Sequence, residues 1–226
     1  MFLIDEFNFT VLFLVCLGVS LLCLLIANKL GRRQVLQLDD SSTEGGFFIH
    51  RKVLPSSITS FFFYFIWGAL STFFPLYAIN NGVANPGLFF TAMAITLMLG
   101  RALGGKLLDL YRIERVIIFF LTLCIISMTI LAFSKTLPMF ILVGMIWGIG
   151  AAFVNPAIMA YTLDRAGSNR GPAMGTYTAF SDLGVSLGPV IMGIIIPWTG
   201  YPIMFLCLAL IGVINLSYFY FAVSKS

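Results

Sequence analysis

Charge is scarce in this sequence. Only 10% of its 226 residues are Asp, Glu, Lys or Arg, and it contains a single histidine. Soluble domains carry charge on about a quarter of their residues, so this composition excludes an ordinary water-soluble domain. The histidine, His50, stands beside Arg51 and Lys52 in a polar stretch, which is typical of a solvated surface side chain.

The sequence also lacks the motifs of metal sites, cofactor sites and catalytic centres. Each cysteine stands alone in an apolar run, and there is no Gly-rich Walker phosphate loop and no nucleophile elbow. We therefore expect no metal, no cofactor and no enzyme, and an ATP-driven pump has no support. The cysteines, interpreted as small apolar filler, are Cys16, Cys23, Cys124 and Cys207.

What the sequence does contain is long apolar runs. Hydrophobic residues make up 60% of the chain, and the mean hydropathy is +1.02. A helix needs about 20 mainly apolar residues to cross the hydrocarbon core of a membrane. We therefore predict an all-α membrane protein whose seven transmembrane helices lie at residues 8–28, 54–79, 87–108, 115–134, 138–162, 172–196 and 201–223.

The first run stands apart from the other six. A long polar stretch, NKLGRRQVLQLDDSSTEGGFFIHRK, follows it, whereas short turn sequences join the others. We predict an orphan membrane helix in residues 1–30, a cytoplasmic linker in residues 31–52 and a compact six-helix unit in residues 53–226. No basic region precedes the first run and no small-residue cleavage site follows it, so we interpret it as a membrane span and not as a signal peptide.

Positive charge falls on one side of these spans. Of the 13 Lys and Arg residues, only Lys135 lies in a loop on the opposite side. Cytoplasmic loops carry the excess of Lys and Arg in membrane proteins. We therefore predict a multi-pass plasma-membrane protein with its N-terminus outside and its C-terminus in the cytoplasm. The net charge of +4 belongs to this bias, and no nucleic-acid partner is expected.

Three motifs point to a family. In GGKLLDLYRIERV, Gly105, Asp109 and Arg115 stand as in the short cytoplasmic loop signature of the major facilitator superfamily. Two positions depart from that signature, because Leu110 replaces a basic residue and Arg112 replaces glycine. The stretch DLGVSLGPVIMG is similar to the family's Gly-xxx-Gly-Pro helix, and WGIGAAFVNP resembles its fourth-helix motif. The chain thus resembles the C-terminal part of such a transporter.

The resemblance implies a register and an activity. Family members have twelve helices in two six-helix halves joined by a long cytoplasmic linker. The six-helix unit would then supply helices 7 to 12 and the first run helix 6, while the first five helices have no counterpart in this sequence. We expect a truncated secondary active transporter that needs its N-terminal half or self-association, driven by gradients and embedded in the lipid bilayer.

The resemblance also implies two structural devices. A conformational latch would be formed by Gly105, Asp109, Arg112 and Arg115, with Asp109 closing onto the other half of the transporter. The alternative is that the charges of this turn only solvate it and fix the topology. Small residues let membrane helices approach closely, and the expected helix-packing motif consists of Gly184, Gly188, Pro189 and Gly193.

Asp182 is the polar residue that most strongly suggests a function, because it lies near the middle of the sixth run. An ionised carboxylate at that depth costs several kcal/mol unless it is paired, hydrated or protonated. One hypothesis is that Asp182 couples transport to protons or another cation. The alternative is a structural role, with hydrogen bonds to Thr178, Ser181 or Ser186.

Other polar residues are candidates for the lining of a solute cavity. Tyr64 and Trp67 lie on one helical stripe, and Asn155 and Tyr177 join them as candidates for the substrate pathway. The alternative is packing against lipid or a sister helix. Arg101 is expected to snorkel to the cytoplasmic interface. An aromatic lining without clustered charge suits a moderately apolar or amphiphilic small molecule, as in efflux permeases of the family.

Three functions remain open. The chain is a secondary transporter of the efflux type, a remnant without transport of its own, or a membrane scaffold or regulatory subunit that binds a full transporter. Efflux upon co-expression with a complementary half would favour the first. Poor accumulation of the protein in cells would favour the second. Co-purification with a transporter whose flux does not change when Asp182 is mutated would favour the third.

Overall fold

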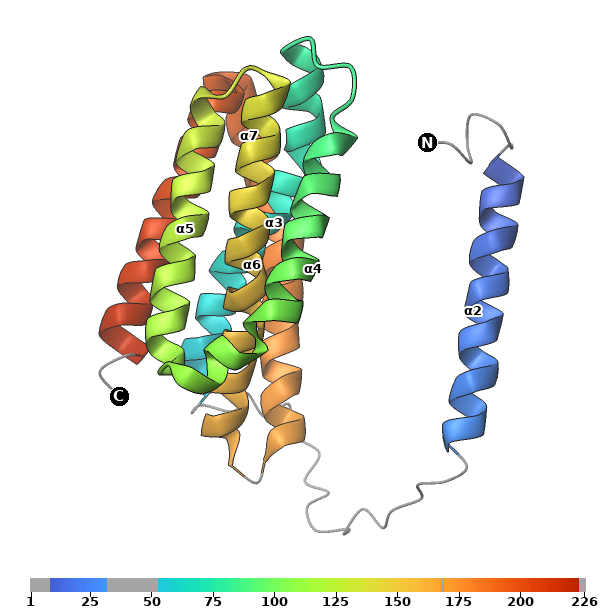
Figure 1. Ribbon diagram of the computed structural model, residues 1–226. Helices are drawn as coiled ribbons and strands as arrows, with labels where there is room; N and C mark the ends of the chain where they lie inside the picture. Colours follow the sequence, from blue (N-terminus) through green and yellow to red (C-terminus); the bar gives the residue numbers. More distant parts are fainter. Residues whose placement is uncertain (1–8, 32–52, 168, 224–226) are drawn as a thin grey trace. The chain divides into compact units, whose positions relative to one another are not determined.

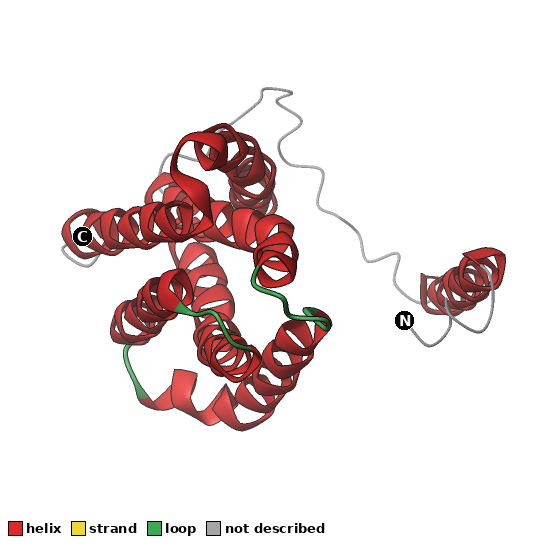
Figure 2. Ribbon diagram, turned by 90° about the horizontal axis from the view of Figure 1, so that it is seen from above, coloured by secondary structure: helices red, strands yellow, loops and turns green. Residues whose placement is uncertain are grey.

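The computed structural model describes residues 9–31, 53–167 and 169–223 of the chain. Within these ranges every regular element is a helix, and short loops join the helices (Figure 2). The chain divides into two units, Met1–Gly46 and Phe47–Ser226, which are described separately. The predicted linker, residues 31–52, lies almost wholly outside the described residues.

The first unit contributes one helix, α2, at Phe9–Gly31. Its described apolar side chains are exposed, among them Phe13, Leu17 and Leu24. A helix that is apolar on every side has no polar face to turn to water, which is typical of a membrane span.

The second unit contains five α-helices and a short π-helical end. Proline opens two of the helices, because Pro55 and Pro138 occupy first-turn positions whose N–H has no helical acceptor. The elements are α3 (Leu54–Asn80), α4 (Gly87–Leu110), α5 (Ile113–Phe133), α6 (Leu137–Ala166), α7 (Arg170–Tyr218) and η2 (Phe219–Val223).

Among the described residues, four helices are long and apolar enough to cross a membrane. They are Leu54–Asn80, Ile113–Phe133, Leu137–Ala166 and Arg170–Phe221, and Phe13–Leu24 and Gly87–Ala102 are shorter apolar helices. The structure therefore shows fewer long spans than the seven predicted from sequence. Part of the difference is that the sixth and seventh predicted runs belong to one element, α7.

The chain breaks within α7 at Gly200. This residue has φ 77° and ψ 171°, a backbone conformation that a side chain would strain. Pro197 and Pro202 flank it, and each removes a backbone hydrogen bond from the helix. In Figure 1 the orange part of α7 before the break and the red part after it run in opposite directions. The predicted boundary between the runs 172–196 and 201–223 thus coincides with a change of direction.

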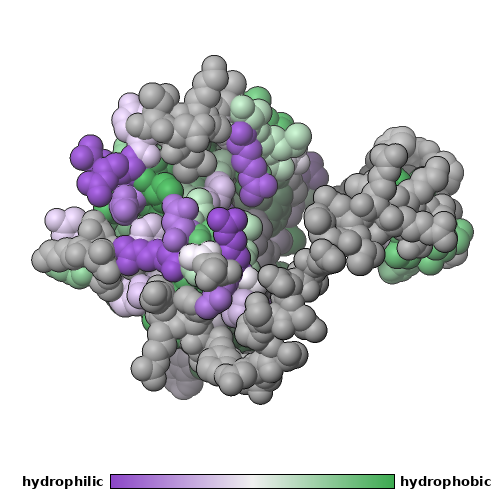
Figure 3. Space-filling view, turned by 90° about the horizontal axis from the view of Figure 1, so that it is seen from below, coloured by the Kyte–Doolittle hydropathy of each residue, from purple (hydrophilic) through white to green (hydrophobic). Residues whose placement is uncertain are grey.

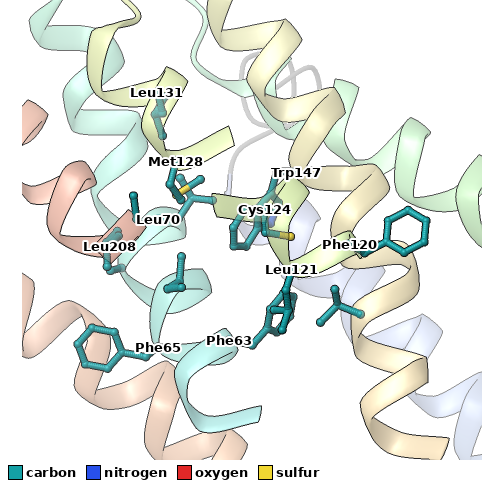
Figure 4. Packing of buried hydrophobic residues seen from close by; sticks show 14 of the residues in the cluster. Phe63, Phe65, Leu70, Phe120, Leu121, Cys124, Met128, Leu131, Trp147 and Leu208 are labelled. Carbon is teal, nitrogen blue, oxygen red and sulfur yellow. The ribbon is translucent and has the colours of Figure 1, made fainter. Parts of the chain in front are cut away.

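Apolar side chains from all five helices of this unit form one core. α3 packs against α7, α4 against α6, and α5 against both α6 and α7. Figure 4 shows part of this core, where the ring of Phe63 on α3 lies near that of Trp147 on α6. Cys124 is buried in the same core, as expected of apolar filler.

Charged side chains gather at one end of the second unit. This end holds the turn between α4 and α5 and the turn between α6 and α7 (Figure 1), and the view from below shows its hydrophilic surface (Figure 3). Its exposed charged residues include Arg112, Arg115, Asp164 and Arg170. Lys135 follows α5 at the opposite end. We refer to the first end as the charged end.

Candidate solute-binding site

A pocket of about 120 Å³ lies between α3, α4 and α6. Each helix contributes side chains spaced four residues apart, and such residues lie on one face of a helix. On α6, for example, Trp147, Ala151 and Asn155 form one ridge. The pocket is lined by Phe63, Tyr64, Trp67, Met93, Leu97, Arg101, Trp147, Ala151 and Asn155.

A second pocket, of about 390 Å³, lies between α4 and α6. It shares Arg101 and Asn155 with the first, so the two spaces meet at these side chains. Pro156 also lines it, and this proline has no N–H to donate to the carbonyl of Ala152 one turn earlier. The two pockets together offer a small aromatic space next to a larger one.

Stacked aromatic rings form one wall of the first pocket. The ring of Trp147 is parallel to that of Phe63, with centroids 5.8 Å apart and an interplanar angle of 5°. Trp67 stacks with Trp147 at 6.4 Å and 13°. Such stacking offers a flat apolar surface against which a hydrophobic solute can pack.

Hydrogen bonds connect α7 to the helices that carry the pocket. The hydroxyl of Tyr177 donates to Oδ1 of Asn155 on α6 over 3.2 Å. The hydroxyls of Ser60 on α3 and Ser181 on α7 are 2.7 Å apart, and both residues are buried. Four of the predicted pathway residues therefore meet, because Tyr64, Trp67 and Asn155 line the pocket and Tyr177 holds Asn155.

The fifth predicted pathway residue, Asp182, lies apart from both pockets. It is exposed, and its side chain has no hydrogen-bond partner among the described residues. The hydroxyl of Ser186 donates instead to the backbone carbonyl of Asp182 over 2.8 Å, and the Ser181 hydroxyl is engaged with Ser60 and the carbonyl of Tyr177.

The exposed surface of α7 carries a polar stripe. At 100° per residue, Thr178, Asp182 and Ser186 follow one another along the helix, and all three are exposed. Leu183 and Val190, exposed by 52% and 59%, lie next to this stripe. The apolar neighbours suit lipid, whereas the polar stripe needs water or a protein partner.

The predicted packing motif lies where α7 meets α3. A Cβ on Gly184 would collide with the backbone carbonyl of Phe61, and one on Gly188 with that of Phe65. Gly193 has more room, since its nearest neighbour would be Phe73 at 3.4 Å. Glycine thus lets two helix backbones approach closely at Gly184 and Gly188, as small residues do at membrane helix interfaces. Pro189, beside Gly188, is half-buried.

The predicted latch residues lie at the charged end. Gly105 and Asp109 belong to the last turns of α4 and not to a loop, because only residues 111–112 separate α4 from α5; nothing is described of their side chains. Arg112 lies 3.8 Å from Glu114, with side chains 76% and 28% exposed, and such an exposed pair contributes little to stability. Arg115 is exposed.

A shallow space of about 610 Å³ lies beside the latch turn. It is shared with the end of α6, where Asp164 and Arg165 lie, and the Arg165 guanidinium stands 4.8 Å from the ring centre of Tyr161. Arg112 and Glu114 therefore share this space with the charged side chains of Asp164 and Arg165. The described residues hold no group of His, Cys, Asp and Glu arranged to bind a metal ion.

Comparison with known proteins assigns the fold to a family. Residues 57–226 match the Major Facilitator Superfamily. This chain belongs to that superfamily. The family predicted from the three motifs is thereby confirmed, and the chain is a multi-pass membrane protein of a transporter family, not an enzyme.

This chain is similar to the "Staphylopine export protein" of Staphylococcus aureus (strain Mu50 / ATCC 700699). The two are 32% identical over 175 residues, which is 74% of this chain and 44% of the relative. The major facilitator chain described here therefore spans less than half the length of that protein.

Sequence reasoning missed part of the pocket. It did not single out Phe63 or Trp147, and it did not include Arg101, which lines both pockets, among the pathway residues. The missed signal was the four-residue spacing of Met93, Leu97 and Arg101 on α4, which repeats on α3 and α6.

Proposed function

We propose that this chain forms the C-terminal half of a secondary transporter that exports a small amphiphilic solute. The observation that carries the proposal is the pocket between α3, α4 and α6, where stacked aromatic rings meet the polar side chains of Arg101 and Asn155. Ligand sites are mainly apolar, with a few polar groups that fix orientation. Export is favoured because the related protein is named for export.

The proposed register assigns α2 to helix 6 and α3 to α6 to helices 7 to 10. The two antiparallel parts of α7 would be helices 11 and 12, so that the chain crosses the membrane seven times. Residues 1–30, 31–52 and 53–226 would form the orphan helix, the cytoplasmic linker and the transporter half. The charged end would face the cytoplasm, because it gathers the basic side chains.

The remaining helices would come from another part of the protein or from another chain. The exposed polar stripe of Thr178, Asp182 and Ser186 supports a partner or a water-filled path on that side of α7. Substrate then binds near the interface of two halves that rock against each other. In this arrangement Asp182 is the candidate for proton coupling, and Asp109 is the candidate for a latch onto the other half.

Co-expression tests the proposal. The chain is produced in cells with and without a chain that supplies the first five helices of a major facilitator protein, and efflux of preloaded fluorescent amphiphiles is followed. We expect efflux only when both are present, and a marked loss of efflux with Asn155→Ala. Asp164→Asn, at the exposed end of α6, serves as the matched control.

Two alternatives predict different results in the same cells. A remnant without transport would be degraded. Co-expression of the second chain would then change neither the amount of this protein in the cells nor the efflux. A scaffold or regulatory subunit would co-purify with a complete transporter, and Asn155→Ala would leave that transporter's flux unchanged. Either result would overturn the transporter proposal.

A further inference from the structure

We infer that the transported solute carries an anionic oxygen group and binds with that group between Arg101 and Trp147. This inference rests on the proposed function and narrows it to amphiphilic anions. It depends on which hydrogen bonds the pocket can still make, on where charge lies, and on the size of the two connected spaces.

The pocket has more free hydrogen-bond donors than acceptors. Arg101 carries five N–H donors and no acceptor, and the indole of Trp147 is a donor only. Oδ1 of Asn155 already accepts from Tyr177, which leaves the two N–H groups of this amide for a ligand. The hydroxyl of Tyr64, which also lines the pocket, can either donate or accept. A group that fits such a lining is rich in acceptors.

The indole N–H of Trp147 is the most specific of these donors. The side chain is fully buried, it lines the pocket, and its Nε1 has no hydrogen-bond partner among the described residues. Buried donors in folded proteins are nearly always paired. Nε1 is itself buried, so a solute oxygen that displaces its neighbours on the pocket side would supply the missing acceptor. The stacked rings of Phe63 and Trp67 hold the indole in place.

Arg101 supplies a positive charge without a counter-charge. No described carboxylate lies within ion-pair distance of Arg101. With a rise of ~1.5 Å per residue, it stands roughly 13 Å along α4 from Leu110 at the charged end. Its side chain is exposed, so water can reach it. A cation at this depth of a membrane needs hydration or a counter-charge, and a solute anion would supply the counter-charge.

The same charge distribution disfavours a cationic solute. The acidic residues of the second unit whose side chains are described are Glu114, Asp164 and Asp182, and none lines either pocket that contains Arg101. An ammonium group in the pocket would therefore face the Arg101 charge without compensation.

The sizes of the two spaces suggest how an amphiphilic anion is placed. The pocket of about 120 Å³ can hold an acid group and a few carbon atoms against the aromatic wall. The adjoining space of about 390 Å³, with Phe153 and Met159 in its lining, can take an apolar remainder. Arg101 and Asn155 lie where the two spaces meet.

Equilibrium binding to the full chain in lipid nanodiscs tests the inference. The probes are tritium-labelled 4-phenylbutyrate, its neutral amide, 4-phenylbutylammonium and phenylphosphonate, with empty nanodiscs subtracted. We expect the carboxylate to bind at least about tenfold more tightly than the amide, as a charged hydrogen bond predicts, and the ammonium to bind least. The phosphonate distinguishes a carboxylate site from a general oxyanion site.

Variants show whether the named residues cause this preference. Arg101→Gln should abolish the difference between carboxylate and amide, and Arg101→Lys should keep part of it. Trp147→Phe keeps a ring but removes the N–H, so it should weaken the carboxylate about tenfold and the amide much less. Lys135→Gln, at the other end of the unit, removes a charge without touching the pocket and should change nothing.

The wild-type chain alone can overturn the inference, even if a variant fails to fold. Equal binding of carboxylate and amide, or preferred binding of the ammonium, would refute the anionic site while leaving efflux in the co-expression assay unaffected. Absence of binding by all four probes would also refute it. Failure of the proposed function would instead be seen as absence of efflux, whatever the probes do.

Discussion

The hydroxyl of Tyr177 on α7 donates to Oδ1 of Asn155 on α6 over 3.2 Å. This bond joins α7, which packs closely against α3, to α6, the helix that carries Trp147. Because Oδ1 is engaged, the NH₂ group of Asn155 remains available to a ligand. The geometry of the pocket is thus set by a residue, Tyr177, that does not line it.

Removing this hydroxyl should affect binding more than stability. Single hydrogen bonds between membrane helices contribute about 0.6 kcal/mol on average, so Tyr177→Phe should lower the free energy of unfolding by less than about 2 kcal/mol. The freed amide can rotate, and binding of 4-phenylbutyrate should weaken severalfold. Unfolding in mixed micelles and nanodisc binding measure the two effects.

Tyr220→Phe is the matched control for this change, because Tyr220 is 51% exposed and lies outside the pocket. It should leave both quantities unchanged. A loss of stability without any loss of binding in Tyr177→Phe would show that the bond only supports the fold.

Two glycines of α7 should respond in opposite ways to the same substitution. Gly188→Ala places a Cβ against the carbonyl of Phe65, and because backbone cannot yield easily it should destabilise the protein by about 1–3 kcal/mol. Gly175→Ala meets nothing within 4 Å and should be neutral or stabilising by up to about 1 kcal/mol. Equal effects in an unfolding titration would argue against a close contact between α3 and α7.

Asp182 should control the pH dependence of transport if it carries a proton. In the co-expression assay, Asp182→Asn should flatten the dependence of efflux on external pH, because the asparagine cannot titrate. Asp164→Asn removes a carboxylate from the exposed end of α6 and should keep the wild-type profile. An unchanged profile in Asp182→Asn would leave Asp182 with a structural or interface role.

The predicted orientation can be measured by labelling with a membrane-impermeant maleimide. In a background where the four native cysteines are replaced by serine, Lys135→Cys should react in intact cells, because Lys135 lies at the end opposite to the charged end. Arg112→Cys should react only after permeabilisation. The reverse pattern would invert the topology, and reaction of both in intact cells would contradict a single orientation of the chain.

The functional residues were only partly predictable, for a reason visible in Trp147 and Asn155. Asn155 is a polar residue next to a proline in an apolar run, and this local oddity marks it in the sequence. Trp147 is an aromatic residue among many, and its importance comes from Phe63 and Trp67 on another helix. Contacts between helices leave no mark in the local composition of either helix.

The sequence by itself determined the membrane environment, the family and the helical runs, because hydropathy, charge placement and short motifs are properties of contiguous residues. It also marked the break near Gly200, where glycine and two prolines interrupt the helix. Only the tertiary structure decided that Tyr64, Trp67, Arg101 and Asn155 share one pocket and that Asp182 stands outside it. Those relationships depend on the rotation and spacing of helices against one another, which side-chain packing between distant segments sets.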